Sequence, residues 1–255
     1  MKQVDALIVA VEEIARKTIK MDIRISKEIL SEIKPGQFVH IKVGEGTEFM
    51  LRRPISICDL DMKEETLTLI FKIFGEGTEM LARLKPDQAI NLLIPCGNGY
   101  SIDSIEADEV LLIGGGIGVP PLYYLGKKLQ EKNIKVTSIL GFQSSADVFY
   151  EAAFQSLGAT YIATNDGTYG TEGFVTDVID HFGLKGDYYF SCGPTPMLKA
   201  VETKLHDTKG FLSLEERMGC GIGACYACVV KTQDGESNKK VCQDGPVFEA
   251  NEVEL

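Results

Sequence analysis

The spacing of four cysteines near the C-terminus constrains the fold of this chain more than any other feature. Cys220, Cys225 and Cys228 follow the pattern C-x4-C-x2-C, and Cys242 stands fourteen residues further on. This spacing is typical of plant-type [2Fe–2S] ferredoxins. Glycine and alanine occupy most positions between the first three cysteines, so the backbone can wrap closely and turn its N–H groups towards sulfur. The pattern predicts a [2Fe–2S] cluster bound by these four thiolates.

Other uses of the cysteines are a zinc site and a purely structural role. Zinc sites usually present two separated C-x2-C pairs rather than three ligands on one glycine-rich loop. A disulfide framework needs an oxidising compartment, but Asp5, Glu12 and Glu13 stand where a signal peptide needs an apolar core. We therefore expect a cytoplasmic protein that uses these thiols for redox chemistry. Cys58 and Cys96, on strand-like segments, are expected in the core.

Charge and hydropathy argue against two classes of partner. The 255 residues carry a formal net charge of −11, whereas binding to nucleic acid or to an anionic membrane relies on clustered Lys and Arg. The most apolar segment, residues 110–125, is shorter than a membrane span and is interrupted by glycines and prolines. Neither nucleic acid nor a membrane is an expected partner.

Hydrophobic patterning predicts a multidomain β and α/β protein with three regions. Residues 1–101 contain short, evenly spaced β-type runs and one helical stretch at 78–86, which is typical of an antiparallel β-barrel. Residues 102–209 alternate strand and helix patterns, which predicts a doubly wound parallel sheet with ligands at the carboxyl ends of its strands. Residues 210–255 form the small cysteine-rich domain.

A [2Fe–2S] cluster takes one electron at a time, so a two-electron partner requires an intermediary such as a flavin. The segment RRPISI begins a predicted strand, where Arg53 can pair with a diphosphate and Ser56 can offer a hydroxyl to a flavin ring. The segment FGEGT at residues 74–78 opens the predicted barrel helix and suits a phosphate. An exposed Arg with a strand Ser, and a simple turn with a Thr cap, are the alternatives for these motifs.

The segment IGGGIGVPP at residues 113–121 lies between a buried strand and a helix. It departs from the G-x-G-x-x-G fingerprint, but its glycines allow a pyrophosphate to approach the backbone closely. A 2′-phosphate would need a basic partner, but residues 141–152 contain no Lys or Arg and do contain Asp147 and Glu151. This favours NAD over NADP. Cys192, at the end of the last parallel strand, is either a nicotinamide contact or a buried thiol.

The order of these motifs resembles the ferredoxin–NADP reductase superfamily. With the cysteine segment added, the chain resembles in particular the electron-transfer subunits of type B, NAD-dependent dihydroorotate dehydrogenases. The similarity covers the whole chain and includes RRPIS, GGGIGVPPLY, CGPTPML and ERMGCGIGACYACVV. The short polar segment between Cys228 and Cys242 is the one departure from the family pattern.

The resemblance implies FAD in the barrel, NAD on the parallel sheet, and a [2Fe–2S] cluster. The implied FAD contacts are Arg53, Pro54, Ile55, Ser56, Ile70, Phe71, Lys72, Gly77 and Thr78. The implied NAD contacts are Gly114, Gly115, Gly116, Gly118, Cys192 and Gly193. Within these sets, Ser56 is expected beside the flavin ring and Cys192 beside the nicotinamide, and both are candidate catalytic residues.

The resemblance also implies a partner, namely an FMN-containing catalytic subunit that oxidises dihydroorotate to orotate in pyrimidine (UMP) biosynthesis. Two copies of each subunit would form a heterotetramer, and electrons would pass from FMN through the cluster and FAD to NAD. One alternative is a reductase subunit of a ferredoxin-linked or sulfur-reducing complex. A second is a zinc-stabilised binding module without redox activity.

Overall fold

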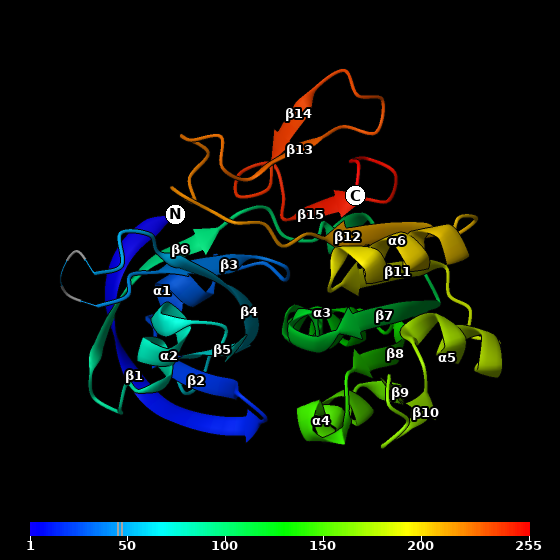
Figure 1. Cartoon of the computed structure of the whole chain (residues 1–255), viewed down its shortest axis with the longest axis horizontal. Coiled ribbons are helices and arrows are strands. Elements are labelled where there is room, and N and C mark those ends of the chain that lie inside the picture. The colour runs from blue at the N-terminus through cyan, green and yellow to red at the C-terminus, as the bar shows by residue number, and fades with distance from the viewer. Residues whose placement is uncertain (45, 47) are drawn as a thin grey trace.

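Two lobes of different architecture lie side by side in the computed structural model, which describes residues 1–44, 46 and 48–255 (Figure 1). The elements of the first lobe are β1 (Lys2–Ala15), β2 (Thr18–Arg24), α1 (Lys27–Leu30), β3 (Phe38–Ile41), β4 (Arg53–Asp61), β5 (Thr66–Lys72), α2 (Glu76–Ala82) and β6 (Ala89–Cys96). The six strands close into an antiparallel barrel in the order β1-β2-β5-β4-β3-β6. The predicted antiparallel barrel is confirmed.

Alternation of apolar and polar residues builds this barrel. In β2, Ile19, Met21 and Ile23 are buried, while the residues between them are only partly covered. Closure of the sheet leaves no unpaired strand edge, which removes a route to aggregation. Helix α2 spans residues 76–82 rather than the predicted 78–86. The Thr78 hydroxyl accepts hydrogen bonds from the N–H groups of Phe74 and Gly75, at 2.9 and 3.3 Å, and so starts the helix earlier.

The second lobe is a seven-stranded sheet with helices on both faces. Its elements are η1 (Ile102–Ser104), β7 (Glu109–Gly115), η2 (Gly116–Gly118), α3 (Pro120–Glu131), β8 (Lys135–Phe142), η3 (Ser145–Asp147), α4 (Glu151–Gln155), β9 (Gly158–Thr164), β10 (Thr171–Glu172), α5 (Val175–Phe182), β11 (Tyr188–Cys192), α6 (Thr195–Lys204), β12 (Lys209–Ser213) and β15 (Val247–Glu249). The strand order is β10-β9-β8-β7-β11-β12-β15. The predicted doubly wound parallel sheet is confirmed.

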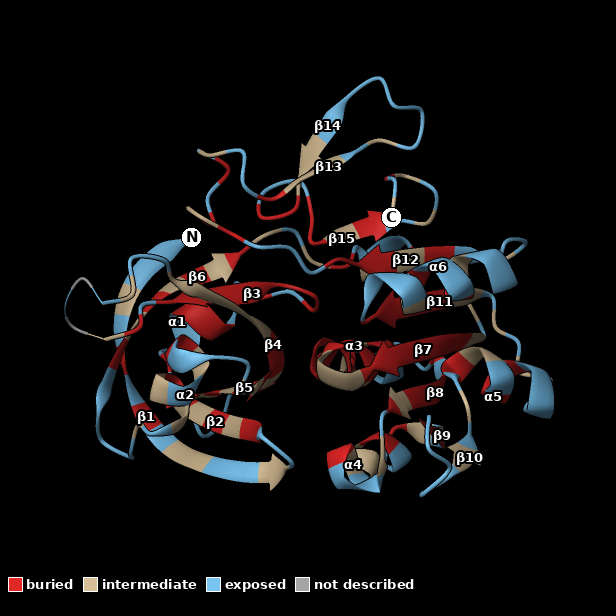
Figure 2. Cartoon of the chain, viewed as in Figure 1, coloured by how far each residue is buried: buried red, intermediate tan, exposed pale blue. Residues whose placement is uncertain are grey.

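Helices α3 and α4 cover the face of this sheet that looks towards the barrel, and α5 and α6 cover the other face (Figure 1). The central strand β7 is consequently buried on both sides, as Figure 2 shows, and its residues 110–113 are completely inaccessible. A strand buried on both faces has a continuous run of apolar residues rather than alternating apolar and polar residues. The first reversal of strand order lies between β7 and β11, where a ligand crevice is expected.

The C-terminal segment lies above both lobes and contains the hairpin β13 (Val229–Lys231) and β14 (Asn238–Lys240) (Figure 1). Its strand β15 pairs antiparallel with β12 and so extends the sheet of the second lobe. Cys228, Val241 and Cys242 are buried in one apolar cluster with Phe38 and Cys96 of the barrel. The predicted boundary between residues 209 and 210 falls within β12, and the predicted domain limits remain a prediction.

Ion pairs connect the two lobes. The buried carboxylate of Asp147, in η3, accepts hydrogen bonds from Arg16 Nε, in the turn after β1, at 3.2 Å and from Lys72 Nζ of β5 at 3.0 Å. Lys127 of α3 pairs with Asp59 of β4 at 2.6 Å. These contacts hold the barrel and the parallel sheet in one relative orientation. No helix in the described part of the chain is long and apolar enough to cross a membrane.

Candidate cofactor sites

The four predicted ligand cysteines lie together in the C-terminal segment as two pairs. The backbone N–H groups of Cys220 and Cys225 each point to the sulfur of the other residue, at 3.4 and 3.3 Å. In the second pair, the N–H of Cys242 points to the sulfur of Cys228 at 3.5 Å. Two pairs of thiolates suit the two irons of a [2Fe–2S] cluster, which has four protein ligands in total.

A single zinc ion would require a different arrangement of the cysteines. A structural zinc site needs four donors around one point. The backbone contacts join the sulfurs two by two instead, which suits a site with two irons.

Backbone N–H groups surround the sulfur atoms. The N–H of Ile222 points to Cys220 Sγ at 3.5 Å, and that of Gly223 points to Cys242 Sγ at 3.2 Å. Burial alone would raise the pKa of Cys220, but N–H groups, led by that of Ile222, lower the pKa to about 6. Burial and the neighbouring Cys228 thiol raise the pKa of Cys242 to about 12. The donors favour thiolate, the form that binds metal.

Two glycines of the ligand loop are required by close packing. A β-carbon on Gly221 would lie 2.3 Å from His40 Nδ1, and one on Gly223 would lie 1.9 Å from Gln243 Oε1. Both glycines have positive φ angles, +68° and +77°. The loop can therefore wrap the sulfurs only with glycine at these positions, and the residues present fit a [2Fe–2S] cluster.

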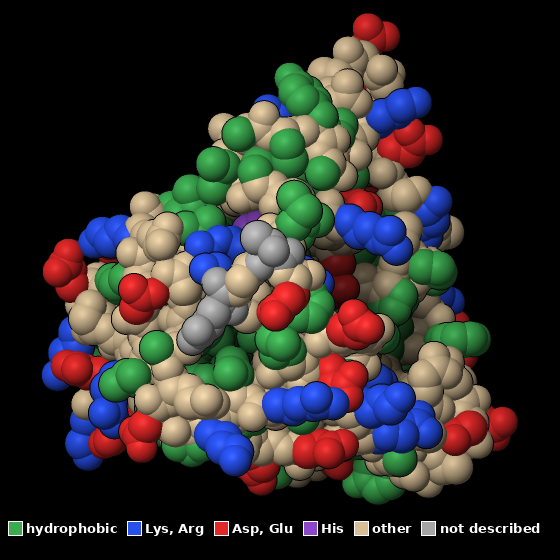
Figure 3. Space-filling view, turned by 60° about the vertical axis from the view of Figure 1, so that its left-hand side comes forward, with side chains coloured by type: hydrophobic (Ala, Val, Ile, Leu, Met, Phe, Trp, Pro, Cys, Tyr) green, Lys and Arg blue, Asp and Glu red, His purple; other side chains and the backbone are tan. Residues whose placement is uncertain are grey.

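Tyr226, between the second and third cysteines, is 77% exposed. The ammonium group of Lys240 lies over its ring, 4.5 Å from the ring centre, and also donates a hydrogen bond to the Gly223 carbonyl at 2.7 Å. Lys240 thus joins the hairpin to the ligand loop. Apolar side chains gather on this protruding part of the surface, above a hollow between it and the lobes (Figure 3).

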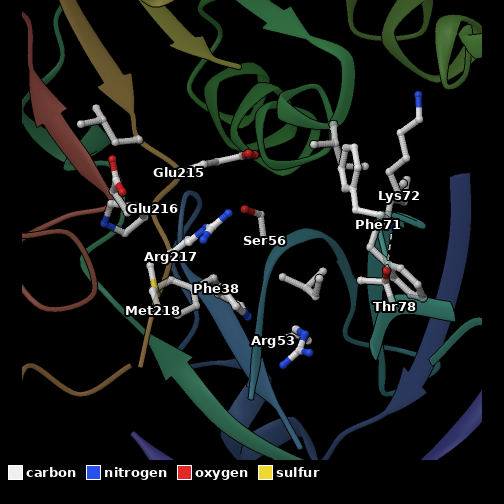
Figure 4. Close-up of a pocket in the computed structure, with 17 residues that line it drawn as sticks. Phe38, Arg53, Ser56, Phe71, Lys72, Thr78, Glu215, Glu216, Arg217 and Met218 are labelled. Atoms are coloured by element: carbon white, nitrogen blue, oxygen red, sulfur yellow. Dashed lines mark hydrogen bonds between the residues drawn. The ribbon is translucent and has the colours of Figure 1, made fainter. Parts of the chain in front are cut away.

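A cavity of about 400 Å³ lies between the barrel strands and the segment that follows β12. Eight of the nine predicted FAD contacts line it, as Figure 4 shows in part: Arg53, Pro54, Ile55, Ser56, Ile70, Phe71, Lys72 and Thr78. The ninth, Gly77, lies behind Arg53, because a β-carbon there would be 2.6 Å from the guanidinium group. The structure therefore brings the three barrel motifs together around one space.

The charged residues Arg53 and Lys72 of this cavity differ in whether their charged groups are available to a ligand. Arg53 lies over the ring of Phe49 and donates a hydrogen bond to the Leu51 carbonyl, which leaves other N–H groups for a ligand. Lys72 points away from Arg53 and Ser56 (Figure 4), since its ammonium group pairs with Asp147. Lys72 therefore contributes its stem and backbone to the cavity, while its charge joins the lobes.

Part of the cavity wall comes from residues that the sequence analysis did not assign to FAD. Leu214, Glu215, Glu216, Arg217 and Met218 follow β12 and line the space opposite the barrel strands. Glu215 is open to the cavity yet surrounded by protein, and desolvation raises its pKa. Glu215 follows the end of a strand, and parallel sheets bind their ligands at such strand ends. This position could have indicated the residue from the sequence.

A second cavity, of about 460 Å³, lies at the carboxyl ends of the parallel strands. Its wall consists of Gly115, Gly116, Gly141, Phe142, Gln143, Asn165, Phe174, Val175, Thr176, Pro194, Pro196, Met197 and Ala200. None of these side chains is charged, so nothing in the wall would neutralise a 2′-phosphate. Asp147 does not face this space, and the sequence argument that used its charge against NADP is not supported.

The other predicted nucleotide residues form the floor behind this wall. Gly114 pairs with Cys192 across β7 and β11, and a β-carbon on Gly118 would lie 2.3 Å from the Cys192 carbonyl oxygen. Gly193 packs against Gly115. Cys192 itself lines neither cavity; it is fully buried, and burial raises the pKa of its thiol. Cys58 and Cys96 are buried as predicted.

Comparison with known proteins identifies the family. Residues 215–254 match the iron–sulfur cluster binding domain of dihydroorotate dehydrogenase B, and residues 112–203 match an oxidoreductase NAD-binding domain. Proteins from Bacillus cereus (strain AH187) and Bacillus anthracis (strain CDC 684) are 54% identical over 226 residues, covering 87% of this chain and 87% of each relative. Both are named dihydroorotate dehydrogenase B (NAD(+)), electron transfer subunit. The chain belongs to this family. The predicted family and oxidoreductase class are thereby confirmed.

Solved structures agree with this family and extend it to a wider fold. An NADH-dependent reduced ferredoxin–NADP oxidoreductase superimposes with a TM-score of 0.87 at 30% identity, covering 98% of this chain and 89% of that one. A cytochrome P450 reductase from Amycolatopsis has a TM-score of 0.67 at 21% identity, with 80% and 66% coverage. The second likeness concerns the fold alone. The predicted iron–sulfur and NAD cofactors agree with the matched domains.

Proposed function

We propose that the chain carries electrons between a partner catalytic subunit and NAD, through a [2Fe–2S] cluster and FAD. One observation carries this proposal: the segment that walls the barrel cavity runs directly into the ligand loop. Met218 lines the cavity, and Cys220 comes two residues later. A cluster on the loop and a flavin in the cavity would therefore be neighbours, as one-electron transfer between them requires.

In this proposal the barrel cavity holds FAD, which exchanges hydride with nicotinamide and single electrons with the cluster. Arg53 binds the diphosphate through its remaining N–H groups, and Gly77 allows the guanidinium to lie close to α2. Ser56 offers its hydroxyl to the flavin ring. Glu215, whose pKa is raised by desolvation, faces the same space and lies within the wall that a bound ring would contact.

NAD would occupy the uncharged cavity at the strand ends. Gly115 and Gly116 allow the pyrophosphate to approach the backbone. Gly114, Gly118 and Gly193 allow the segments behind the cavity to pack closely, since a β-carbon at any of them would clash with its neighbours. Cys192, buried under that floor, would support the nicotinamide site from below rather than meet solvent. The lack of any basic side chain in the wall supports NAD as the nucleotide.

The proposed partner is the FMN-containing catalytic subunit of dihydroorotate dehydrogenase, two copies of each chain forming a heterotetramer. The names of the relatives support this partner. We further propose a cytoplasmic location, because thiols that bind a cluster must stay reduced and a reducing compartment keeps them so.

Co-expression with the catalytic subunit tests the proposal. The purified complex should show flavin and iron–sulfur absorption and should reduce NAD when dihydroorotate is added. With Cys225→Ser, reduction of the bound flavin by NADH should persist, whereas dihydroorotate-dependent NAD reduction should fall to background. A complex that reduces NAD equally well with Cys225→Ser would contradict the proposed route.

A second candidate function is a reductase subunit of a ferredoxin-linked complex. The likeness to the NADH-dependent reduced ferredoxin–NADP oxidoreductase, over 98% of this chain, favours it. The same purified chain separates the two candidates. Rapid NADH-dependent reduction of ferredoxin, with no activity towards dihydroorotate in the presence of the catalytic subunit, would favour this second function.

A further inference from the structure

His40 is a buried polar side chain without a partner. It lies in β3 of the barrel and is 0% exposed, and neither Nδ1 nor Nε2 makes a hydrogen bond of normal geometry. Burying a polar group without a hydrogen bond is unfavourable, so a buried imidazole of this kind needs a specific explanation. The environment of His40 indicates which partner that is.

The imidazole lies directly under the ligand loop. A β-carbon on Gly221 would be 2.3 Å from Nδ1, so the backbone next to Cys220 rests on this edge of the ring. The carbonyl groups of Cys220 and Arg52 lie near the ring, without completing a normal hydrogen bond. The ring is therefore enclosed between the barrel and the residues that carry the first ligand.

The strand of His40 also reaches the barrel cavity. His40 pairs with Pro54 of β4, and Phe38, two residues earlier on β3, lines the cavity wall. His40 thus lies between the proposed flavin site and the ligand loop. An apolar residue would fill this space equally well, so packing alone does not explain an imidazole here.

We propose that His40 is a positioning residue for the cluster, donating its ring N–H to the ligand shell at Cys220 when the cluster is bound. This inference rests on the proposed function, because it requires the four thiolates to hold a cluster. Thiolate ligands bring several hydrogen-bond acceptors to a loop whose described donors are backbone N–H groups. A donor from outside the loop would stabilise the reduced cluster and fix the loop against the barrel.

Selective isotope labelling tests the contact without any mutation. The chain contains three histidines, and the other two, His181 and His206, are exposed on the second lobe. The full chain would be produced with ¹⁵N-histidine in an otherwise ¹⁴N background, its cluster reduced with dithionite, and pulsed EPR used to record nitrogen couplings. A ¹⁵N coupling to the reduced cluster is expected. Its absence from a protein that holds a reduced cluster would overturn the proposal.

Substitution tests the effect on the cluster. In His40→Leu the ratio of reduced to oxidised cluster at a fixed potential should fall about tenfold, equal to about 59 mV for a one-electron couple. His40→Gln, which keeps an N–H donor, should recover part of this shift. Ser138→Ala is the matched control, since Ser138 is also fully buried with an unpartnered hydroxyl, but in β8; its potential should not change.

The outcomes separate this inference from the proposed function. A chain that binds no iron would contradict the proposed function itself. A chain with a normal cluster, no histidine coupling and an unchanged potential in His40→Leu would contradict only the role of His40. If His40→Leu fails to retain its cluster, the labelled native chain still decides the question.

Discussion

The barrel cavity and the nucleotide cavity have similar volumes, about 400 and 460 Å³, but they are built from different parts of the chain. Charged side chains from two distant segments wall the first, Arg53 on β4 and the run Glu215, Glu216 and Arg217 after β12. Glycines, prolines and uncharged side chains at strand ends wall the second. Charged side chains in a cavity wall can bind a ligand tightly, which suits a cofactor that stays bound. An uncharged wall suits a nucleotide that must leave after each reaction.

Removing the charge of Arg53 should have the largest effect on the difference between the two cavities, because it removes a cation from the charged one. Arg53→Ala removes the cation that we assign to the FAD diphosphate, and hydrogen bonds to charged groups contribute about 1.5–3 kcal/mol. FAD binding should therefore weaken roughly 10- to 100-fold, measured as flavin retained on purification and by titration of the flavin-free chain. Arg83→Ala, on the exposed end of α2, is the control and should retain its flavin. Normal flavin content in Arg53→Ala would refute the assignment.

The two cavities act together only if the lobes keep their orientation, which depends on Asp147. Burial opposes ionisation, but hydrogen bonds led by that from Arg16 hold the pKa of Asp147 below its ordinary value. Asp147→Asn should lower the free energy of unfolding by about 1–3 kcal/mol at pH 7. A group with a lowered folded pKa stabilises above its unfolded pKa and loses that effect as pH falls.

Urea unfolding of the native chain and of Asp147→Asn at a series of pH values checks this prediction. The difference between them should be full at pH 7 and should shrink as pH falls below about 4. Asp180→Asn, which disrupts the exposed pair with Lys204, should cost about 0–1 kcal/mol. A difference for Asp147→Asn that does not change with pH would show that its charge is not responsible.

Adding a charge to the neutral cavity should sharpen the comparison. Gln143→Arg places a guanidinium at the end of β8, where a 2′-phosphate would need a cation. The kcat/KM for NADPH should rise about tenfold relative to that for NADH, measured as flavin reduction in stopped-flow experiments. Gln143→Glu serves as the control of opposite charge and should reject NADPH. No change in either variant would place the nucleotide elsewhere.

The smallest effect is expected at the ligand loop. Tyr226→Ala removes the ring under Lys240, and an exposed cation–π contact contributes about 0.5–1 kcal/mol. Loss of iron in the presence of a chelator should become about two- to fivefold faster, as followed by the decay of visible absorption. Tyr226→Phe keeps the ring and should behave like the native chain. Equal rates for Tyr226→Ala and Tyr226→Phe would remove any role for the ring.

Much of the architecture follows from local patterns. Alternation in segments such as β2, and the continuous apolar run of β7, report burial on one face or on both, because neighbouring residues decide what a strand can cover. The cysteine spacing works in the same way, since three ligands on one tight loop depend on a few consecutive residues. These features predicted the barrel, the parallel sheet and the ligand loop.

Contacts between distant segments were not predictable in this way. Glu215 faces the barrel cavity because β12 ends above it, and nothing within its own segment reveals the opposite wall. Lys72 lies in a predicted FAD motif, yet its charge is directed to Asp147, seventy-five residues away. Cys192 ends a strand at the expected crevice, but packing buries its side chain beneath the floor.

The sequence by itself determined the pattern of strands and helices, the spacing of the cysteines and the glycine segments, because each depends on residues close together in the chain. Only the tertiary structure decided that the ligand loop continues the wall of the barrel cavity and rests on His40. It also decided that one cavity is charged and the other neutral. The physical reason is that these properties arise where strands far apart in sequence end side by side, and that proximity exists only once both lobes have folded.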